Sequence, residues 1–436
     1  MTTELTETPA GSAPPKVALP TWAQGAGFLT ARRGALHACR ARYGSVFELA
    51  LPVFGSAVFI ADPTMAKQLF TSGAKTINVQ PNLGRVLGSG SMFGIEGAEH
   101  RRRRKLLTPP LHGKRIRTYE EIVEDEVRRE IATWRTGERF ASLDPMMRIT
   151  LNVILRAVFG ADGSDFDTLR ELMPKLVAAG SRAATIPELP RPLRLVDPNV
   201  RLREHRVRYD RTIRRIIGDS RADPSLTDRD DILALMLQST YDDGSVMTDD
   251  EIADELLTLL AAGHETTATT LAWAFERLQR HPAVLRDLTD EARGDGGELR
   301  HAVILETQRS RPVIDLAGRH VVADDLEIGP WHIPRGHNAI VAISLLHDDS
   351  DQFREPERFD PSRFIGTTLS AAWIPFGGGT RRCIGAAFAT MEMDVTLRTV
   401  LREFDLRPTT ARAEGLHSRG VASAPRFGGR ITVDRR

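Results

Sequence analysis

The stretch that decides the fold is Phe376-Gly-Gly-Gly-Thr-Arg-Arg-Cys-Ile-Gly385, which holds four glycines, two arginines and one of the chain's two cysteines. An apolar segment, residues 371–375, precedes it, and a run of helix-forming residues, 386–394, follows it. Cys383 therefore comes just before a helix N-terminus, where free backbone N–H groups and the helix dipole favour an anion. The pattern predicts that this thiol is present as a thiolate.

The composition of the same stretch indicates what the thiolate could bind. Glycines have no Cβ atom, so a flat ligand could lie directly against the backbone, and Arg381 supplies a cation for an acidic group on that ligand. A heme iron held by a cysteine thiolate, with its propionates paired to arginine, satisfies these features together. The alternative interpretations are a nucleotide-type glycine loop and an ordinary turn with a buried thiol.

The spacing also resembles the heme-binding loop of the cytochrome P-450 family, whose pattern is Phe-x-x-Gly-x-Arg-x-Cys-x-Gly. All five fixed positions are filled here, by Phe376, Gly379, Arg381, Cys383 and Gly385. The resemblance implies that Cys383 is the iron ligand of a heme b (iron protoporphyrin IX). It also implies that the cofactor is contacted by the loop residues Phe376, Gly377, Arg381 and Gly385.

Size and composition narrow the class of protein. The 436 residues include 59 basic and 58 acidic side chains, a balance that argues against a nucleic-acid binder. Two cysteines, Cys39 and Cys383, are too few for a disulfide scaffold and favour a reducing, cytoplasmic location. No run of apolar residues is long enough for a membrane span. We expect a flexible leader over residues 1–25, a single heme domain over 26–436, and a monomer.

The remaining pattern predicts a mainly α fold with small β-sheets, and the resemblance implies that this is the cytochrome P-450 architecture. A helix is expected from about Phe28 to Tyr43, long helical stretches over 119–160 and 165–220, and prolines interrupt the second of these stretches near 187–198. Thr248-Asp-Asp-Glu251 is a capping box that opens a helix to about Arg280. Short strands are expected at 46–51, 57–60, 320–322, 338–343, 403–406 and 430–433, the last two at sheet edges.

A dense basic run, His100 to Lys105, has several possible meanings. A nucleic-acid patch and a solvated helix face are the general interpretations of such a block. His100 and Arg104 share a helix face, however, and they match a family element that reaches a heme propionate. By resemblance we expect His100 and Arg104 to point inward. The other basic residues of the run are expected at the surface, where an acidic electron-transfer partner could dock.

Polar residues interrupt the apolar middle of the long helix at Ala262-Gly-His-Glu-Thr-Thr267. Such groups are costly inside a buried helix unless they have partners, although a helix break without chemistry would also explain them. The segment matches the family's oxygen-activation motif. That match implies that Thr266 hydrogen-bonds oxygen above the iron, Glu265 supplies protons and Ala262 contacts the heme. His264 is expected to be a supporting or solvent-facing residue and not a ligand.

Two further elements match the family in position. Glu306 and Arg309 form a Glu-x-x-Arg pair, and Arg358 follows in Pro356-Glu-Arg-Phe359, which by resemblance completes a buried structural triad. Arg319 matches a second arginine that binds a heme propionate. These residues are expected to hold the region around the heme and to take no part in the chemistry.

The resemblance covers roughly residues 28–436 and implies a heme-thiolate monooxygenase. Such an enzyme inserts one oxygen atom from O2 into a small apolar organic substrate, here lipid-like, terpenoid, steroid or polyketide. The electrons are expected to come from a separate ferredoxin and an NAD(P)H-dependent ferredoxin reductase. The alternatives are a peroxide-driven peroxygenase and a non-enzymatic heme carrier or sensor.

Overall fold

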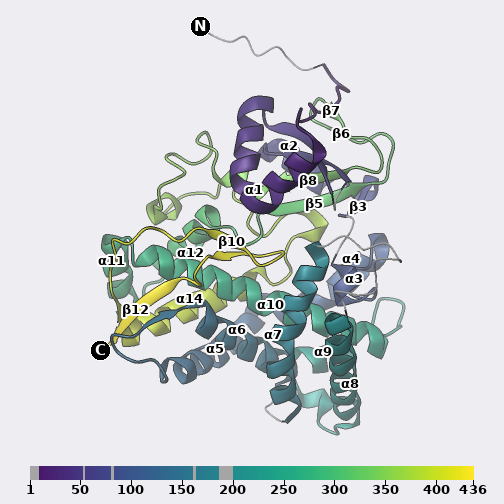
Figure 1. The fold of residues 1–436 in the computed structure, drawn as a ribbon. Coiled ribbons are helices and arrows are strands. Elements are labelled where there is room, and N and C mark those ends of the chain that lie inside the picture. The colour runs from purple at the N-terminus through teal and green to yellow at the C-terminus, as the bar shows by residue number, and fades with distance from the viewer. Residues whose placement is uncertain (1–8, 53–54, 80–82, 161–163, 186–199) are drawn as a thin grey trace. The chain divides into compact units, whose positions relative to one another are not determined.

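The computed structural model describes residues 9–52, 55–79, 83–160, 164–185 and 200–436. The chain forms two compact units. The first unit comprises Met1–Asn82, Asp315–Glu357 and Leu369–Cys383, and the second comprises Leu83–Ile314, Arg358–Thr368 and Ile384–Arg436. Figure 1 labels many of the helices and strands of each unit.

The first unit is built on a five-stranded sheet with the order β1-β2-β8-β5-β3. The hairpin of β1 (Val46–Leu51) and β2 (Gly55–Ile60) was expected, and β8 (Asn338–Ala342) then pairs in parallel with β2. The other two strands are β5 (Leu316–Val321) and β3 (Thr76–Asn78). Because Phe47 and Phe59 stack and Phe28 of α1 (Thr21–Tyr43) meets Phe59 edge-on, the helix is held against the sheet by aromatic packing.

The ends of this unit differ slightly from the sequence expectation. The first helix, α1, begins at Thr21, earlier than the expected Phe28. Before it, Ser12 bridges to Trp331 in β7 (Trp331–His332), which pairs with β6 (Glu327–Ile328), and Lys16 bridges to Glu48. The unit also contains α2 (Pro63–Phe70), which Asp62 caps through Met65 N–H, and the short α13 (Ile343–His347).

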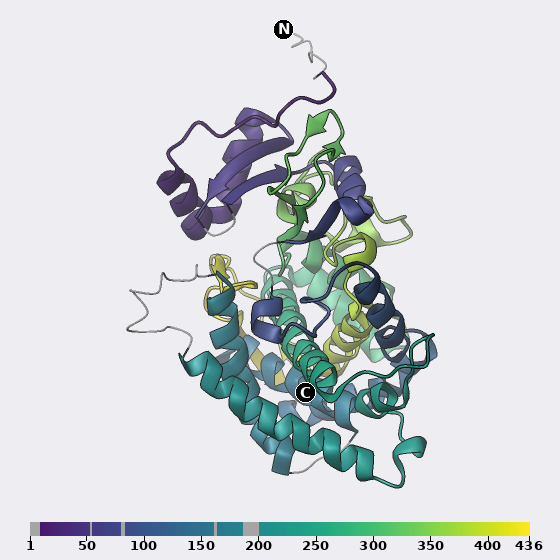
Figure 2. The same ribbon diagram turned by 90° about the vertical axis from the view of Figure 1, so that its right-hand side faces the viewer.

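The second unit is mainly helical. Its helices are α3 (Gly84–Leu87), α4 (Gly97–Leu107), α5 (Ile116–Ile131), α6 (Leu143–Phe159), α7 (Ser164–Thr185), α8 (Val200–Ala222), α9 (Ile232–Gln238), α10 (Asp249–Leu278), α11 (Pro282–Arg293), α12 (Glu298–Ser310) and α14 (Ala386–Glu403). The long teal helices α7 and α8, which pack on each other, can be followed in Figure 2. The expected stretches 119–160 and 165–220 each divide into two helices. The prolines near 187–198 lie outside the described residues.

Helix α10 is the element against which α6, α8, α12 and α14 all pack. It starts at the predicted capping box, where Thr248 Oγ1 accepts from Glu251 N–H and the Glu251 carboxylate accepts from Thr248 N–H. Its thirty residues correspond to roughly 45 Å of helix. Most of its side chains are buried, so a polar residue on it sits where the core would otherwise be apolar.

Two small sheets complete the second unit. The first has the order β4-β12-β9, formed by β4 (Arg139–Ala141), β12 (Arg430–Arg435) and β9 (Phe404–Leu406). The expectation that both C-terminal strands are edge strands was therefore wrong for β12, which pairs with β4 through its first half and with β9 through its second. The second sheet is the hairpin of β10 (Leu416–Ser418) and β11 (Ser423–Pro425). None of the helices in the described ranges has the length and apolarity needed to cross a membrane.

Candidate functional site

In the first unit, the loop that carries Cys383 has a backbone fixed by its own hydrogen bonds. Cys383 N–H donates to the carbonyl of Phe376 at 2.9 Å, and Gly377 N–H donates to the carbonyl of Ile374 at 3.0 Å. Gly377 and Gly379 both have φ of +65°, a conformation that L side chains rarely adopt. The Cys383 side chain at the end of this loop is exposed. The predicted loop residues are therefore held in one defined turn.

Close packing explains two of the loop glycines. A Cβ atom on Gly378 would lie 2.3 Å from the ring of Phe70, and one on Gly379 would lie 2.1 Å from the Phe70 carbonyl oxygen. At Gly377 and Gly385, in contrast, a Cβ atom would meet no atom within 4 Å. The first pair lets the loop approach α2 closely, and the second pair leaves its other side open.

The predicted propionate arginines of this unit are Arg319 and Arg381. Arg319, in β5, is buried, donates from Nη2 to the carbonyl of Gly378 at 3.2 Å and lies over the ring of Phe70. The structure thus brings Arg319 to the cysteine loop, although Arg319 precedes Cys383 by 64 positions in the sequence. Arg381 is on the loop itself and is partly buried.

Helix α4 of the second unit carries the other predicted propionate residues. His100 is buried, and Arg104, one turn later, is partly buried. The expectation that the rest of the basic run is at the surface was wrong for Arg103, which is 1% exposed and pairs with Glu255 and Glu251 of α10. The reason is geometric, because Arg103 lies three residues after His100 and so shares its helix face. Arg101, Arg102 and Lys105 are exposed, as expected.

The middle of α10 has an unusual burial pattern. Ala262 is exposed and Gly263 and Thr266 are partly exposed, although residues 264, 265 and 267 of the same helix are buried. Thr266 Oγ1 donates to the carbonyl of Ala262 at 2.9 Å, which is the expected bond back along the helix. Small residues and one hydroxyl therefore form an open face on a helix that is otherwise packed.

The side chain of Glu265, next to Thr266 on α10, contacts an arginine that is distant in sequence. The Glu265 side chain is only 10% exposed, and its Oε1 accepts from Arg419 Nε at 3.1 Å. Arg419 lies in the turn between β10 and β11 and is 39% exposed. This ion pair was not expected from the sequence, because Arg419 belongs to no local motif.

His264 is fully buried, which excludes the solvent-facing alternative. Its Nδ1 is 2.7 Å from the carbonyl oxygen of Leu260, and its Nε2 has no hydrogen-bond partner among the described residues. Burial lowers the pKa of His264 to about 4, and the charge of Arg419 acts in the same direction. The imidazole is therefore neutral, and Thr150 Oγ1 of α6 donates to its backbone carbonyl at 3.0 Å.

A second buried acid, Glu392, is on α14 nine residues after Cys383. Burial raises the pKa of Glu392 well above its usual value and outweighs the opposing effect of the Thr267 hydroxyl. The carboxyl group is therefore neutral inside the core. It was not identified from the sequence, where a glutamate in a helical run looks like a solvated residue.

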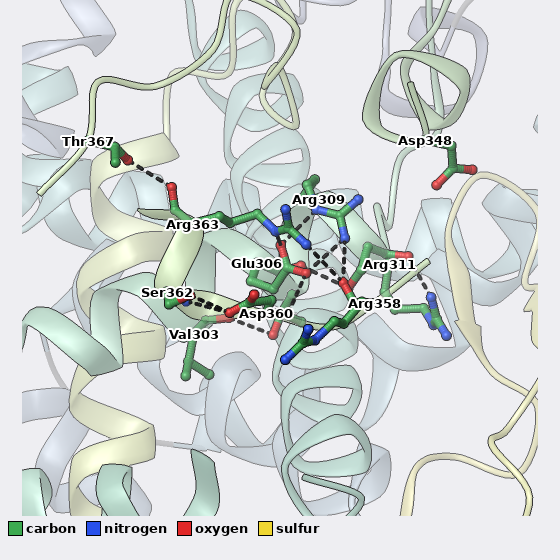
Figure 3. A network of polar contacts seen from close by, with 12 residues as sticks. Val303, Glu306, Arg309, Arg311, Asp348, Arg358, Asp360, Ser362, Arg363 and Thr367 are labelled. Atoms are coloured by element: carbon green, nitrogen blue, oxygen red, sulfur yellow. Dashed lines mark hydrogen bonds and ion pairs between the residues drawn. The ribbon is translucent and has the colours of Figure 1, made fainter. Parts of the chain in front are cut away.

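The predicted buried triad was wrong for Arg358, which is exposed, and Arg363 is the second arginine beside Glu306 (Figure 3). Arg309 donates to Glu306 through Nε at 2.7 Å and Nη2 at 2.8 Å, and both side chains are fully buried. Arg358 takes part through its backbone carbonyl, which accepts from Arg309 Nη2 at 3.2 Å. Arg363, which the sequence analysis missed, lies 3.3 Å from Glu306 Oε2, and Asp360 N–H donates to Glu306 Oε1.

Two histidines support the chain on either side of Cys383. In the first unit, Ile374 N–H donates to Nε2 of the buried His347 at 3.1 Å. In the second unit, His112 Nε2 is 3.0 Å from the carbonyl oxygen of Ile384, the residue after the cysteine. Neither histidine belongs to a recognisable motif, so the sequence offered no signal for them.

An open pocket of about 730 Å³ lies in the second unit, away from the predicted site residues. It is lined by Phe159, Gly160, Asp165, Phe166, Ile216, Asp219, Ser220, Asp223, Asp228, Arg229, Asp230 and Asp231. Arg229 bonds to Asp223 and Asp231, so part of the acidic charge is already neutralised. No cluster of His, Cys, Asp or Glu in the described ranges has the arrangement of a metal site made of three or more such residues.

The residues present fit a heme. An exposed thiol stands at the end of a rigid turn whose glycines leave one side open, and Arg319 and Arg381 supply cations on the same unit. A single protein thiolate with nearby arginines is the donor set of heme-thiolate proteins. We therefore assign Cys383 as the residue that would hold the iron, with Arg319 and Arg381 toward the propionates.

Comparison with known proteins identifies the class. The family model described as cytochrome P-450 matches residues 15–426, so the chain belongs to the cytochrome P-450 family. It is 54% identical over 425 residues to the Mycobacterium tuberculosis protein named "Putative cytochrome P-450 138", covering 97% of this chain and 96% of that protein. It is 39% identical over 416 residues to "Putative cytochrome P-450 135B1" of the same species, covering 91% and 86%.

Solved structures confirm the predicted fold. A cyanobacterial CYP120A1 with bound retinoic acid superposes with a TM-score of 0.84 at 23% identity, covering 98% of this chain and 100% of that chain. The heme domain of cytochrome P-450DA superposes with a TM-score of 0.86 at 21% identity, covering 98% of both chains. The predicted class and cofactor are confirmed: this is a heme b protein of the heme-thiolate monooxygenase class, which uses O2, an organic substrate and redox partners.

Proposed function

We propose that this enzyme inserts one oxygen atom from O2 into a small, apolar, lipid-like substrate, with electrons from a separate ferredoxin and an NAD(P)H-dependent ferredoxin reductase. The observation that carries the proposal is the open face of α10, where Thr266 stands beside the buried acid Glu265. We also retain the prediction of a single heme domain over residues 26–436 and of a monomer. The small number of cysteines, two in the sequence, supports a cytoplasmic location.

The bound heme supplies the redox chemistry, because electron donation from a thiolate favours cleavage of the O–O bond. The chain has to hold the iron, deliver protons and exclude bulk water. Cys383 performs the first task from a turn with little freedom to move. We assign proton delivery to the Thr266 hydroxyl and the Glu265 carboxyl, and propionate binding to His100, Arg104, Arg319 and Arg381. Phe376, Gly377, Gly385 and Ala262 are assigned as cofactor contacts.

The substrate class is supported by apolar side chains of the second unit that pack around Trp273 of α10. Val313, Trp273 and Ala422 form a small buried apolar cluster, with Ile314 packed against it. We propose that Val313, Ile314 and the turn between β10 and β11 line the substrate cavity. An apolar lining favours a substrate that gains from leaving water.

A spectroscopic series tests the proposal. The ferrous protein with carbon monoxide should show the long-wavelength absorbance band of a thiolate-ligated heme, and Cys383→Ser should lose it while Cys39→Ser keeps it. A panel of fatty acids, terpenoids, steroids and macrolides should then be screened for shifts of the heme absorbance. Retention of the band in Cys383→Ser would refute the ligand assignment.

Turnover of the selected compound distinguishes the oxidant. The proposal requires that product formation depend on O2, NAD(P)H, ferredoxin and reductase. The presence of an acid and a threonine at the adjacent positions 265 and 266 argues against the peroxygenase alternative, because an enzyme that receives its oxygen already reduced has less need of proton delivery. Equal turnover with hydrogen peroxide alone would support that alternative. Failure of every compound to stimulate NAD(P)H consumption would support the carrier or sensor.

A further inference from the structure

The turn between β10 and β11 carries the cation that is bonded to Glu265. Arg419 Nε donates to Glu265 Oε1 at 3.1 Å, and the two residues are 154 positions apart in the chain. The carboxylate is 10% exposed and the arginine 39% exposed. One end of this ion pair therefore lies in the interior, and the other reaches solvent.

The turn is held on both sides, so the position of Arg419 is not accidental. Ser423 anchors it at one end, because its N–H donates to the carbonyl of Val313 at 2.8 Å and its carbonyl accepts from Trp273 Nε1 at 3.0 Å. Arg419 N–H donates to the carbonyl of Ala422 at 2.8 Å, which closes the turn. These bonds fix where the Arg419 side chain begins.

Gly420, the next residue, brings the turn against α7. Its φ is +101°, and a Cβ atom there would lie 2.7 Å from the carbonyl oxygen of Ser181. The turn therefore touches α7 on one side and, through Arg419, α10 on the other. A shift of either helix would therefore change the distance between Arg419 and Glu265.

The form of the contact also matters. A carboxylate that lies in the interior is costly without a polar partner, and Arg419 provides such a partner for Glu265. The contact uses Nε alone, and the guanidinium remains partly in water. A single contact of this kind is weaker than a two-point arginine–carboxylate pair and can open more easily.

We propose that Arg419 is the positioning residue of Glu265. It holds the carboxylate toward the exposed end of the β10–β11 turn, where water can return the proton that Glu265 passes on. This inference rests on the proposed role of Glu265 in proton delivery and adds the residue that orients it. Arg419 itself contacts neither substrate nor cofactor in this scheme.

The test uses the full-length, heme-loaded protein and the variants Arg419→Gln, Arg419→Lys, Glu265→Gln and the double Arg419→Gln/Glu265→Gln. The matched control is Arg426→Gln, because Arg426 is an exposed arginine at the other end of the same hairpin, near the ring of Phe427. A plant-type ferredoxin and its reductase supply electrons without added substrate. The first readout is hydrogen peroxide released per NADPH consumed. The second readout is amide hydrogen exchange of residues 416–423.

Loss of proton delivery should divert electrons to peroxide. We expect Glu265→Gln and Arg419→Gln each to raise the ratio of hydrogen peroxide to water among the products of O2 reduction by roughly tenfold. This ratio follows from the peroxide released per NADPH consumed. The double variant should be no worse than either single one, since both act on one unit. Arg419→Lys should recover part of the loss, and Arg426→Gln should match the parent protein. Exchange of residues 416–423 should become about fivefold faster in Glu265→Gln and Arg419→Gln, as expected for loss of one partly exposed ion pair.

The outcomes separate the inference from the proposed function. If Arg419→Gln speeds exchange but leaves the peroxide ratio unchanged while Glu265→Gln raises it, Arg419 is only a structural tie and the inference is overturned, with the role of Glu265 intact. If Glu265→Gln leaves the ratio unchanged, both the role of Glu265 and the inference fail. Loss of the carbon monoxide band in the parent protein would instead contradict the proposed function as a whole.

Discussion

Arg309→Met tests whether the buried network around Glu306 holds the second unit together. In the folded protein, Glu306 accepts two hydrogen bonds from Arg309 and one from Asp360 N–H, and it has an ionic contact with Arg363 (Figure 3). Methionine fills much of the volume of the arginine stem but provides no donor. The substitution therefore removes both of the shortest side-chain contacts of Glu306 without leaving a large cavity.

The expected loss of unfolding free energy follows from the burial of the Glu306–Arg309 pair. Glu306 and Arg309 are both fully buried, so the remaining carboxylate cannot recover its lost bonds from water. Removing one partner of such a pair costs about 3–5 kcal/mol of unfolding free energy, because an incompletely compensated charge stays in the interior. Arg363 and Asp360 remain nearby, so we expect a value near the lower end, about 3 kcal/mol.

The assay is urea unfolding of the heme-loaded protein, followed by tryptophan fluorescence and heme absorbance together. Arg293→Met is the matched control, since Arg293 pairs with Asp290 at the same three-residue spacing on α11, with both side chains more than half exposed. That substitution should change the free energy by less than about 1 kcal/mol. Equal effects of the two substitutions would show that burial does not set the strength of the Glu306 network.

Three further predictions concern proton delivery, pH and partner docking. Thr266→Ala should retain heme and the carbon monoxide band but release most of its NADPH-derived electrons as peroxide; coupled turnover in this variant would exclude the hydroxyl from proton delivery. The depressed pKa of His264, about 4 against 6.5, means that the unfolded chain binds the extra proton first, so stability should fall by roughly 3 kcal/mol as pH decreases from about 6.5 to 4. His264→Gln should flatten that part of the pH profile in urea unfolding, and an unchanged slope would contradict the assignment. Arg382→Gln, which removes an exposed charge beside Cys383, should slow reduction by an acidic ferredoxin at low salt and have little effect at high salt; a salt-independent rate would argue against docking there.

The sequence predicted those parts of the site that are local in the chain. The turn at residues 376–385 needs glycine where φ is positive or where Phe70 approaches. The sequence has glycine at these positions, so the turn could be recognised from the glycine spacing alone. The capping box of α10 and the Asp62 cap of α2 are likewise set by neighbouring residues. Their positions could therefore be inferred without any knowledge of the tertiary structure.

The contacts that could not be predicted join residues that are distant in sequence. Arg363 reaches Glu306 because a short helical turn after Asp360 faces α12, and Arg419 reaches Glu265 because the β10–β11 hairpin packs on α10. Arginine is common on surfaces, so its presence in a loop indicates no particular partner. Both arginines could have been found only from the fold.

Arg103 makes contacts of this long-range kind, and these affect a residue that is assigned to the heme. Its guanidinium donates to Glu255, Glu251, the hydroxyl of Tyr241 and the carbonyl of Gly90, which ties α4 to α10 and to the preceding loop. Because α4 is a rigid helix, fixing Arg103 also fixes the direction of His100, one turn earlier on the same face. The burial of His100 agrees with the inward position expected for it, and the buried ion pair of Arg103 holds the helix face that carries both residues. A contact of His100 with a heme propionate stays a prediction.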